Sequence, residues 1–560
     1  MLLDSTYNTS NNKQNFDSKK NRNKLRTTYE WTIDSTSSLK AILSGSRIES
    51  NSNSNYIGSS SSSKNELINE SNRSVINNEK TNTLASNIFW RKRFKKKGRT
   101  ISINTDLSIG NNDNYGFLNA RNTFYSPGIT VLELTDQYKT NTENKSGLST
   151  KAIYTEPLWK NTFLELSYKF ENNKNDAERT TFEKPGFGTE YTQIVDNLSN
   201  HFVFKNTAHT GAFNFKYQQK KINFTVGSGY GNVTYNLNNI EAATQRSVGF
   251  NNFLSNASFG YTPKKQTRYN LSYKGRTKNP TLAQIQPFTD NINPLDVTIG
   301  NPNIQQEFTH SFGFNFSKYQ IIKSRNIYLS ANYSFTNSAI TSSNFYDKQT
   351  AKNVSQSVNV DGNYNFNMWS SYSFELAESF NLDLRFNPNI NRYINFVNGV
   401  KNVNDRANYK FSIGSGYWGD KWINYWFDIG PTYNISSSTI NPVETKYWSF
   451  SSNGNMNMKF KKQKLYVDVE NEINIYEKTS IFKDAVDIYK MNIGIKKSLD
   501  KAENWQAKLF INDIFNSNAD VDRNINSNYI SQTTKQVIRR FVMLSLIYNF
   551  NKNGKPSNGW

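Results

Sequence analysis

The sequence lacks several residue types and patterns on which protein chemistry often depends. Of 560 residues none is Cys, and only 3 are His. The absence of Cys excludes disulfides, thiolate metal sites and Cys nucleophiles. Long apolar runs are also missing, because no stretch approaches the roughly 18 consecutive apolar residues that a spanning helix needs. The sequence is therefore not that of a helical membrane protein.

Aromatic residues are abundant in a chain that is otherwise polar. Hydrophobic residues make up only 36% and the mean hydropathy is −0.74, but aromatics reach 14%, with 32 Tyr and 38 Phe. Disordered chains are poor in aromatics, whereas β-strands with one apolar and one polar face combine these two properties. A single soluble core stops growing near 250 to 300 residues, so the length favours a large β-barrel, which grows around its perimeter.

The formal charge of +22 by itself suggests a polyanionic partner. However, many Lys residues fall in short turns, including Lys95 to Lys97, Lys220 and Lys221, and Lys264 and Lys265. Solvated turns at a membrane surface account for them, so we expect no nucleic-acid partner.

Alternation of apolar and polar residues with period two predicts strands that contact two different environments. The clearest case is residues 465–475, where Leu465, Val467 and Val469 alternate with Tyr466 and Asp468. In a barrel the first set would face lipid and the second the lumen. The last strand, with Val542, Leu544, Leu546, Tyr548 and Phe550 on one face, is similar.

Such strands are joined alternately by short turns and by long Asn/Ser-rich connections. We predict turns near residues 34–37, 95–98, 157–160, 218–221, 263–266, 320–325, 375–378, 418–421, 461–463 and 499–503. We predict connections near residues 49–82, 111–147, 172–208, 232–250, 277–306, 337–360, 390–404, 436–444, 477–485 and 516–536. The serine-rich run from Ser59 to Ser63, which follows Asn51 to Asn55, is of low complexity and predicts a flexible loop tip.

This layout predicts an all-β fold, a large antiparallel transmembrane β-barrel with short periplasmic turns and long extracellular loops. Ten hairpins and one final strand give about 21 strands. Single-chain bacterial barrels have an even number, so we expect 22, with the first strand missing. Met1 to Ser5 do not resemble a signal peptide, so the chain looks truncated at its start. The domains predicted are a barrel, 1–550, and a polar tail, 551–560.

Five segments carry a family resemblance. They are Leu271 to Phe288, Gly300 to Phe316, Phe89 to Ile103, Phe510 to Ser517 and Arg539 to Phe550. They resemble the outer-membrane β-barrel family found at the C-terminal end of TonB-dependent receptor-like proteins. The Gly-Asn-Pro-Asn element at Gly300 is the most specific piece. The family's usual Leu-Lys-Pro before Glu307 is replaced here by Ile304, Gln305 and Gln306.

The resemblance implies a location in the outer membrane of a Gram-negative bacterium and transport without covalent chemistry. It implies contact with outer-membrane lipid, with the barrel assembly machinery, and with the TonB complex through a plug that we expect to be absent from this chain. A surface lipoprotein is a further candidate partner. No enzyme activity, catalytic residue, cofactor or metal is expected, and the substrate-binding residues are unknown.

Other patterns suggest alternative chemistry only weakly. His201, His209 and His310 lack a framework of carboxylate or thiolate ligands. Asp468, Glu470 and Glu472 lie on one face about 7 Å apart, within glycosidase range, but a polar lumen wall explains them better. Glycines such as Gly227, Gly229 and Gly231 are not followed by a helix, so they are not a phosphate loop.

Several Trp residues lie near predicted strand ends, where an aromatic girdle is expected. They are Trp90, Trp159, Trp418, Trp422 and Trp505.

Three hypotheses on the function remain open. The first is a barrel for TonB-dependent uptake of a scarce solute, and the second is a non-transporting barrel that serves as an adhesin, binding or structural protein. The third is a soluble basic β protein that binds polyanions.

Overall fold

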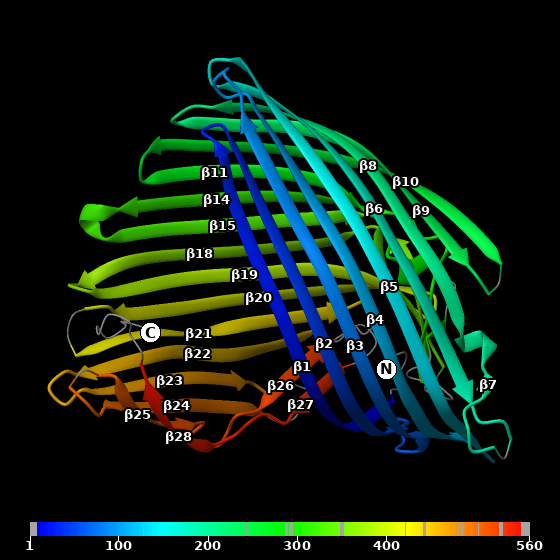
Figure 1. Cartoon of the computed structure of the whole chain (residues 1–560). Coiled ribbons are helices and arrows are strands. Elements are labelled where there is room, and N and C mark those ends of the chain that lie inside the picture. The colour runs from blue at the N-terminus through cyan, green and yellow to red at the C-terminus, as the bar shows by residue number, and fades with distance from the viewer. Residues whose placement is uncertain are drawn as a thin grey trace.

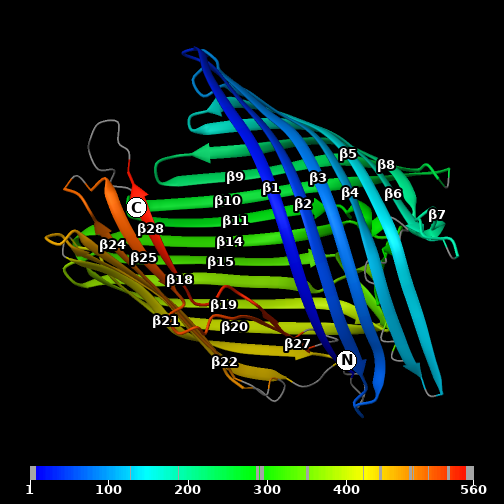
Figure 2. The same ribbon diagram turned by 60° about the horizontal axis from the view of Figure 1, so that its bottom comes forward.

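The computed structural model describes residues 8–549 except 127, 187, 242, 286–288, 291–294, 348–351, 420–421, 441–443, 479–481, 483–484, 502 and 526–529. Almost the whole of this part is one 26-stranded sheet, which curls around a central space (Figures 1 and 2). The all-β prediction is confirmed. No helix in the described part is long and apolar enough to cross a bilayer.

Five short strands belong to the connections, and the other 21 strands of the sheet pair antiparallel in chain order and form the wall. The wall strands are β1 (Thr9–Asp34), β2 (Ser37–Ser61), β3 (Leu67–Arg93), β4 (Thr100–Ser126), β5 (Ile129–Trp159), β6 (Thr162–Glu183), β8 (Asn200–Gln218), β9 (Ile222–Asn239), β10 (Thr244–Lys264), β11 (Thr267–Lys278), β14 (Glu307–Gln320), β15 (Arg325–Asn337), β18 (Asn363–Ala377), β19 (Phe380–Val397), β20 (Val400–Tyr417), β21 (Ile423–Ser438), β22 (Thr445–Phe460), β23 (Leu465–Tyr476), β24 (Val486–Ser498), β25 (Trp505–Asn512) and β28 (Phe541–Tyr548).

The connections carry the remaining elements. They are β7 (Gln193–Ile194), η1 (Asp196–Leu198), α1 (Leu282–Ile285), β12 (Thr289–Asp290), β13 (Asp296–Ile299), η2 (Ile321–Lys323), β16 (Ala339–Tyr346), β17 (Asn353–Val360), and the separate hairpin of β26 (Asp520–Ile525) and β27 (Ile530–Lys535).

The wall agrees with the expected strand count and turns. Its 21 strands match the predicted 21, and each of the ten predicted short turns falls between two wall strands, as between Asp34 and Ser37 or between Phe460 and Leu465. The predicted polar tail, 551–560, lies outside the described residues, as does Phe550 at the end of the predicted last strand.

The connections predicted at 49–82, 111–147, 172–208, 232–250 and 390–404 are too long. Strands β6 and β8 stay paired as far as Arg179 and Asn200, and β9 and β10 as far as Asn239 and Thr244. Strands β2 and β3 stay paired as far as Ser61 and Leu67, β4 and β5 as far as Ser126 and Ile129, and β19 and β20 as far as Val397 and Val400. The predicted serine-rich loop tip is therefore wrong for Ser59 to Ser61, which belong to β2. In residues 49–55 both faces are polar, so no alternation marks the strand. In contrast, β4 and β19 bury apolar residues such as Leu118, Phe124 and Val397 in the regions predicted as connections.

Strands β1 to β6 are far longer than a bilayer requires. They contain 22 to 31 residues each, whereas a tilted strand crosses the hydrocarbon core in about 9 to 11. About half or more of each strand is thus in excess of a crossing, and the strands extend on the side away from the short turns (Figure 1).

The register aligns apolar residues in rows on one face of the wall. One row runs from Trp31 through Leu39 and Trp90 to Ile103. The opposite face of the wall carries small and polar residues such as Ser44 and Ser108. Large apolar residues on the first face are exposed, including Leu43 at 52% and Ile109 at 63%. This outward face meets lipid, and the other face meets the lumen.

Glu156 fixes the basic turn between β3 and β4. Its carboxylate accepts hydrogen bonds from Arg99 Nε at 2.8 Å, from Lys96 Nζ at 2.7 Å and from the Tyr154 hydroxyl at 2.6 Å. These three donors, Arg99 first, hold the pKa of the Glu156 carboxyl well below its usual range. The predicted basic hairpin at Phe89 to Ile103 is confirmed by the turn at 94–99, and its periplasmic side stays a prediction.

The depressed pKa predicts how this turn responds to acid. A carboxyl whose pKa falls on folding stabilises the fold fully above its unfolded pKa, here near 4.5, and progressively less as the pH falls below that value. We expect Glu156→Gln to lower the melting temperature at about pH 7 and to lower it less at about pH 3. Glu66→Gln, in the loop 62–66, is the control. An equal loss at both pH values would contradict the assignment.

Candidate functional site

A polar surface lines the lumen along β21 to β24. Asp468, Glu470 and Glu472 occupy alternate positions on β23, and the register pairs Glu470 with Asn455 on β22 and with Asn492 on β24. The intervening residues face lipid. The predicted separation of the two faces of this strand therefore holds across three neighbouring strands.

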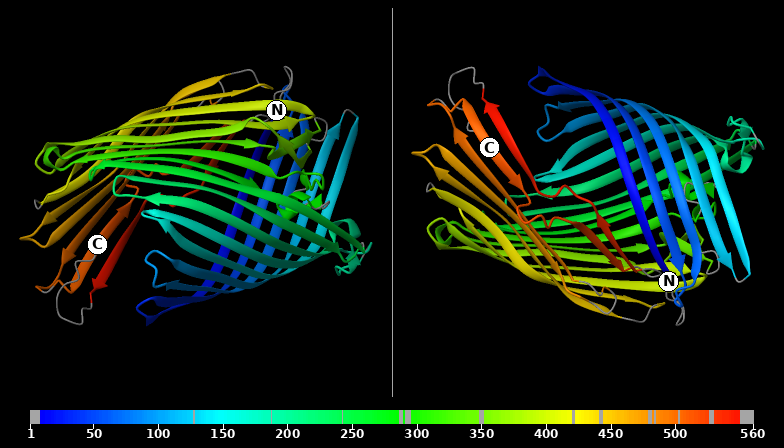
Figure 3. Two further views of the ribbon diagram at one scale, coloured as in Figure 1. Left: turned by 90° about the horizontal axis from the view of Figure 1, so that it is seen from above. Right: turned by 90° about the horizontal axis from the view of Figure 1, so that it is seen from below.

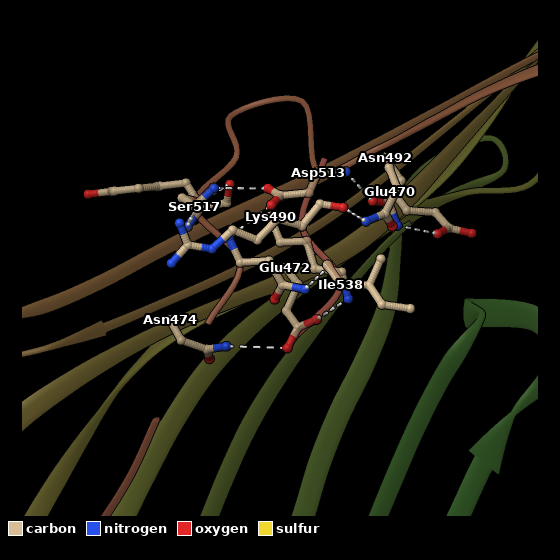
Figure 4. A network of polar contacts seen from close by, with 12 residues as sticks. Glu470, Glu472, Asn474, Lys490, Asn492, Asp513, Ser517 and Ile538 are labelled. Atoms are coloured by element: carbon tan, nitrogen blue, oxygen red, sulfur yellow. Dashed lines mark hydrogen bonds and ion pairs between the residues drawn. The ribbon is translucent and has the colours of Figure 1, made fainter. Parts of the chain in front are cut away.

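The carboxylates of this surface are engaged by neighbouring side chains (Figure 4). Lys490 Nζ lies 3.3 Å from Glu472 Oε2, and Asn492 Nδ2 donates to Glu470 Oε2 at 3.2 Å. Asn474 donates to the other oxygen of Glu472 at 3.4 Å. The two glutamates are thus held by different partners on the wall, which suits a polar lining.

A hollow opens beside these residues. It is lined by Trp418, Trp426, Asn453, Gly454, Asn455, Glu470, Asn471, Glu472, Lys490 and Asn492. Aromatic rings, amides and charges of both signs can contact a polar solute through stacking and hydrogen bonds. Sequence reasoning missed Trp426 because no pattern placed it on the lumen side. Trp418, predicted for the lipid girdle, instead lines this hollow.

The other predicted girdle residues behave differently. Trp90 lies in the outward row, and Trp505 packs on Tyr548 with ring centroids 4.6 Å apart. Trp159 and Trp422 are 70% and 52% exposed. These positions agree with an aromatic girdle near the short turns.

The turn after β25 is fixed by a buried carboxylate. Asp513 is fully buried and accepts hydrogen bonds from the backbone N–H groups of Ser517 at 3.2 Å and Asn518 at 3.0 Å. Its own N–H donates to Asn492 Oδ1 at 3.0 Å (Figure 4). The segment Phe510 to Ser517 is thus connected to the polar surface of the lumen.

A second candidate region lies at the mouth of the ring, at the end opposite the short turns. We call it the cap, and it consists of α1, β12, β13, residues 300–306, β16 and β17. Its antiparallel pairs β12–β13 and β16–β17 are joined by parallel pairing of β13 with β17. Parallel pairing of β16 with β19 joins the cap to the wall. Figure 3 shows these green elements within the ring of wall strands.

The cap packs against the lumen face of the wall beyond the membrane. Ile285 and Ile304 are 7% and 5% exposed and form an apolar cluster with Val233, Tyr235 and Phe250. The rings of Tyr235 and Phe250 meet edge to face at 5.2 Å. Packed apolar contacts of this kind make the cap a fixed part of the structure.

The residues that replace the family's usual Leu-Lys-Pro all take part in this packing. Ile304 is in the apolar cluster, the Gln305 N–H donates to Asn359 at 2.7 Å, and Gln306 donates to the Asn251 carbonyl at 2.6 Å. Glu307 accepts the Ile340 N–H at 3.0 Å. The segment predicted only as a family motif thus supports the cap.

The cap also reaches the N-terminal part of the wall. Lys352 Nζ lies 2.8 and 3.0 Å from the two Glu133 oxygens and 4.8 Å from the centroid of the Phe124 ring. Because 219 positions separate Lys352 from Glu133, no local pattern in the sequence could have indicated this contact.

We expect Lys352→Ala to loosen this contact slightly. The Lys352 and Glu133 side chains are 33% and 42% exposed, and exposed ion pairs contribute about 0 to 1 kcal/mol. Amide hydrogen exchange in β16 and β17 would rise by less than about tenfold. In the cycle with Glu133→Ala, the double variant should resemble either single variant. Full additivity would show that the pair does not interact.

The three histidines lie apart, each with its own partner. His201 Nε2 lies 2.9 Å from Asp176 Oδ1, His209 Nδ1 lies 2.7 Å from the Tyr168 hydroxyl, and His310 stacks on Phe335 at 4.5 Å. No group of three metal-ligating side chains occurs among the residues that the structure describes.

The comparison that decides the family covers most of the wall and the cap. The model of the outer membrane protein beta-barrel family matches residues 92–400, more than half of the chain. The chain belongs to the outer membrane protein beta-barrel family. The barrel is therefore an outer-membrane protein, as its outward apolar rows require.

Solved structures with similarity to the chain include two transporters and one receptor. The copper transporter OprC is 9% identical, with a TM-score of 0.43 over 96% of this chain and 80% of that one. The outer membrane transporter YddB from Escherichia coli is 9% identical, with a TM-score of 0.42 over 95% and 76%. The pyoverdine outer membrane receptor FpvA from Pseudomonas aeruginosa PAO1, bound to pyoverdine, is 9% identical, with a TM-score of 0.44 over 95% and 77%. No curated protein sequence matches the barrel.

Proposed function

We propose that the barrel is the wall of an outer-membrane receptor or transporter for TonB-dependent uptake of a scarce solute. The observation that carries the proposal is the polar lumen surface along β21 to β24, inside a wall of 21 strands. Barrels of eight strands are filled by their own side chains, whereas barrels of about 22 strands hold a separate plug. A wall of this size with a polar lining suits passage of a polar solute.

The route would start at the cap. The solute would first meet the extended strands and the cap at the mouth, and then the hollow lined by Trp426, Glu472 and Lys490. Energy would come from an inner-membrane complex through TonB. The contact with TonB would be made by a plug domain, which is not among the residues that the structure describes. The chain itself supplies binding and a path, without covalent chemistry.

Three further partners would contact this barrel. The outward apolar rows contact outer-membrane lipid, and the closing strand β28 would be recognised by the barrel assembly machinery. A surface lipoprotein would bind at the extracellular end.

The test compares solute depletion from growth medium by the wild type, a strain without this gene, and a strain without TonB. We expect at least one solute whose removal requires both genes. Depletion that is identical in all three strains, or that requires this gene but not TonB, would refute TonB-dependent uptake.

One observation favours the second candidate, a barrel that serves as an adhesin, binding or structural protein. The extension of β1 to β6 beyond the bilayer is a large surface that a transport path does not need. Loss of surface adhesion in the deletion strain, with unchanged depletion of every solute, would support this candidate and exclude the first.

A further inference from the structure

The outward face of β3 to β6 carries a second apolar surface, near the lower ends of these strands in Figure 1. One row of the register there joins Ile76, Phe117, Tyr138 and Phe182, one residue from each strand. Phe117 lies 17 positions from Thr100, where β4 begins after the short turn, whereas a tilted strand crosses the hydrocarbon core in about 9 to 11 residues. The row therefore stands well outside the hydrocarbon.

Two polar rows separate this surface from the part of the wall that meets lipid. They consist of Asn82, Asn111, Asn144 and Asp176, and of Lys80, Asp113, Thr142 and Glu178. An aromatic girdle lies at the boundary of the lipid-facing surface, but here charged side chains lie between the two apolar regions. The second apolar surface is thus separate from the lipid-facing wall.

The apolar side chains of this surface are open to solvent. Ile76, Tyr115, Phe117 and Leu134 are 43%, 50%, 38% and 70% exposed. Contiguous exposed apolar side chains of this kind mark a contact with another molecule. We call the surface the outer patch, and it consists of Ile76, Tyr115, Phe117, Asn119, Arg121, Leu134, Asp136, Tyr138, Phe182, Lys184 and Tyr191.

Tyr191, from the connection after β6, is held over the outer patch by several contacts. The centroid of its ring lies 5.6 Å from that of Phe117 and 6.1 Å from that of Tyr138. Asp136 accepts hydrogen bonds from the Tyr191 hydroxyl at 2.6 Å and from Lys184 Nζ at 2.7 Å. The rings are therefore ordered before a partner binds, which reduces the entropy that is lost on association.

We propose that the outer patch is the contact between two copies of this chain in the same membrane, related by a two-fold axis along the membrane normal. The bilayer holds every copy upright and at one depth, so the outer patches of neighbouring copies lie at the same height. A two-fold contact uses the same surface on both copies, so each favourable contact occurs twice. Charges of both signs, on Arg121, Asp136 and Lys184, surround the apolar centre, so two outer patches carry no single-sign repulsion.

The size of the outer patch favours a partner that the membrane has already oriented. Four strands about 4.8 Å apart and the seven residues from Tyr115 to Arg121, at about 3.3 Å each, give a face of roughly 400 to 500 Å². A specific contact between freely diffusing proteins buries about 800 Å² on each partner. Two barrels confined to one membrane lose less translational and rotational freedom when they associate, so a smaller contact suffices for them.

The test uses the absence of Cys from the chain. The full chain is produced in the outer membrane of cells as Asn119→Cys or Thr140→Cys, at the outer patch, or as Ser437→Cys on the outward face of β21, about half-way round the wall. Cells are treated with a bismaleimide, which bridges two thiols, and the products are separated by size and identified by mass spectrometry.

We expect the two variants at the outer patch to give a product of twice the mass of the chain. Ser437→Cys should give on the order of tenfold less, because only random collisions bring that face of two copies together. The crosslinked fraction of the two patch variants should persist when expression is lowered, since a specific contact does not depend on crowding.

Substitutions within the outer patch complete the test. Added to Asn119→Cys, the change Ile76→Asp/Leu134→Asp places like charges on both copies and should lower the crosslinked fraction on the order of tenfold. Ile76→Val/Leu134→Met keeps the surface apolar and should leave that fraction unchanged. Both positions are exposed, so the fold should tolerate these changes, and heat-modifiable gel mobility checks this.

Several results would overturn the proposal. They are equal yields from the outer patch and Ser437→Cys, no product from either patch variant, a fraction that falls in proportion to expression, and an unchanged fraction in the Asp variant. A product that contains a different protein would also overturn it and would assign the outer patch to that protein. Solute uptake is not measured here, so this proposal can fail independently of the transport function.

Discussion

Val469→Arg is expected to prevent normal assembly of the barrel. Val469 lies on the outward face of β23, between Met456 on β22 and Ile493 on β24, so an Arg there would enter the hydrocarbon. An Arg near the midplane on the lipid face of a barrel costs about 2 to 4 kcal/mol. Refolding into bilayers followed by unheated gel electrophoresis should show a reduced fraction of the compact, heat-modifiable form.

The adjacent residue provides a matched control. Asp468 lies on the same strand and faces the lumen, opposite Asn457 and Gly494. Asp468→Arg keeps its charge in water and should assemble as the wild type does. If both variants assembled equally well, the division of β23 into a lipid face and a lumen face would be wrong.

The membrane-crossing part of the wall could be predicted from the sequence because it separates two solvents. Oil outside and water inside force alternate residues of β23 to differ, so Leu465, Val467 and Val469 reveal the strand without any partner. The short turns could also be predicted from the sequence, because the alternation stops there and charged residues such as Lys461 and Lys462 replace it.

Beyond the membrane this signal disappears. Residues 49–55 of β2 are polar on both faces, so Asn51 to Asn55 belong to a strand although no alternation marks it. Their pairing comes from neighbouring backbones, and the sequence does not encode it as a pattern. Low complexity was therefore mistaken for a loop, although the local register is continuous.

The cap could not be predicted from the sequence for another reason. Ile304 was noted as a departure from a family motif, but its place in the apolar cluster depends on Tyr235 and Phe250, which come from earlier strands. Contacts between distant segments decide its place, and a single sequence does not show such contacts. Trp418 is a different case, because it follows the lumen positions Gly414 and Gly416 of β20 in the same alternation.

Phe250→Ala should release the cap while leaving the wall intact. The Phe250 side chain is 8% exposed in the cluster that joins the cap to β8, β9 and β10, and replacing a buried Phe by Ala costs about 3 to 5 kcal/mol. Because this cluster lies beyond the membrane, the loss falls on the cap. Proteases should then cleave within 277–306 or 337–360, while the barrel keeps its heat-modifiable mobility. Phe253→Ala is the control, since Phe253 is 57% exposed on the outward face of the same strand. Equal protection of the cap in both variants would show that the cluster does not hold it.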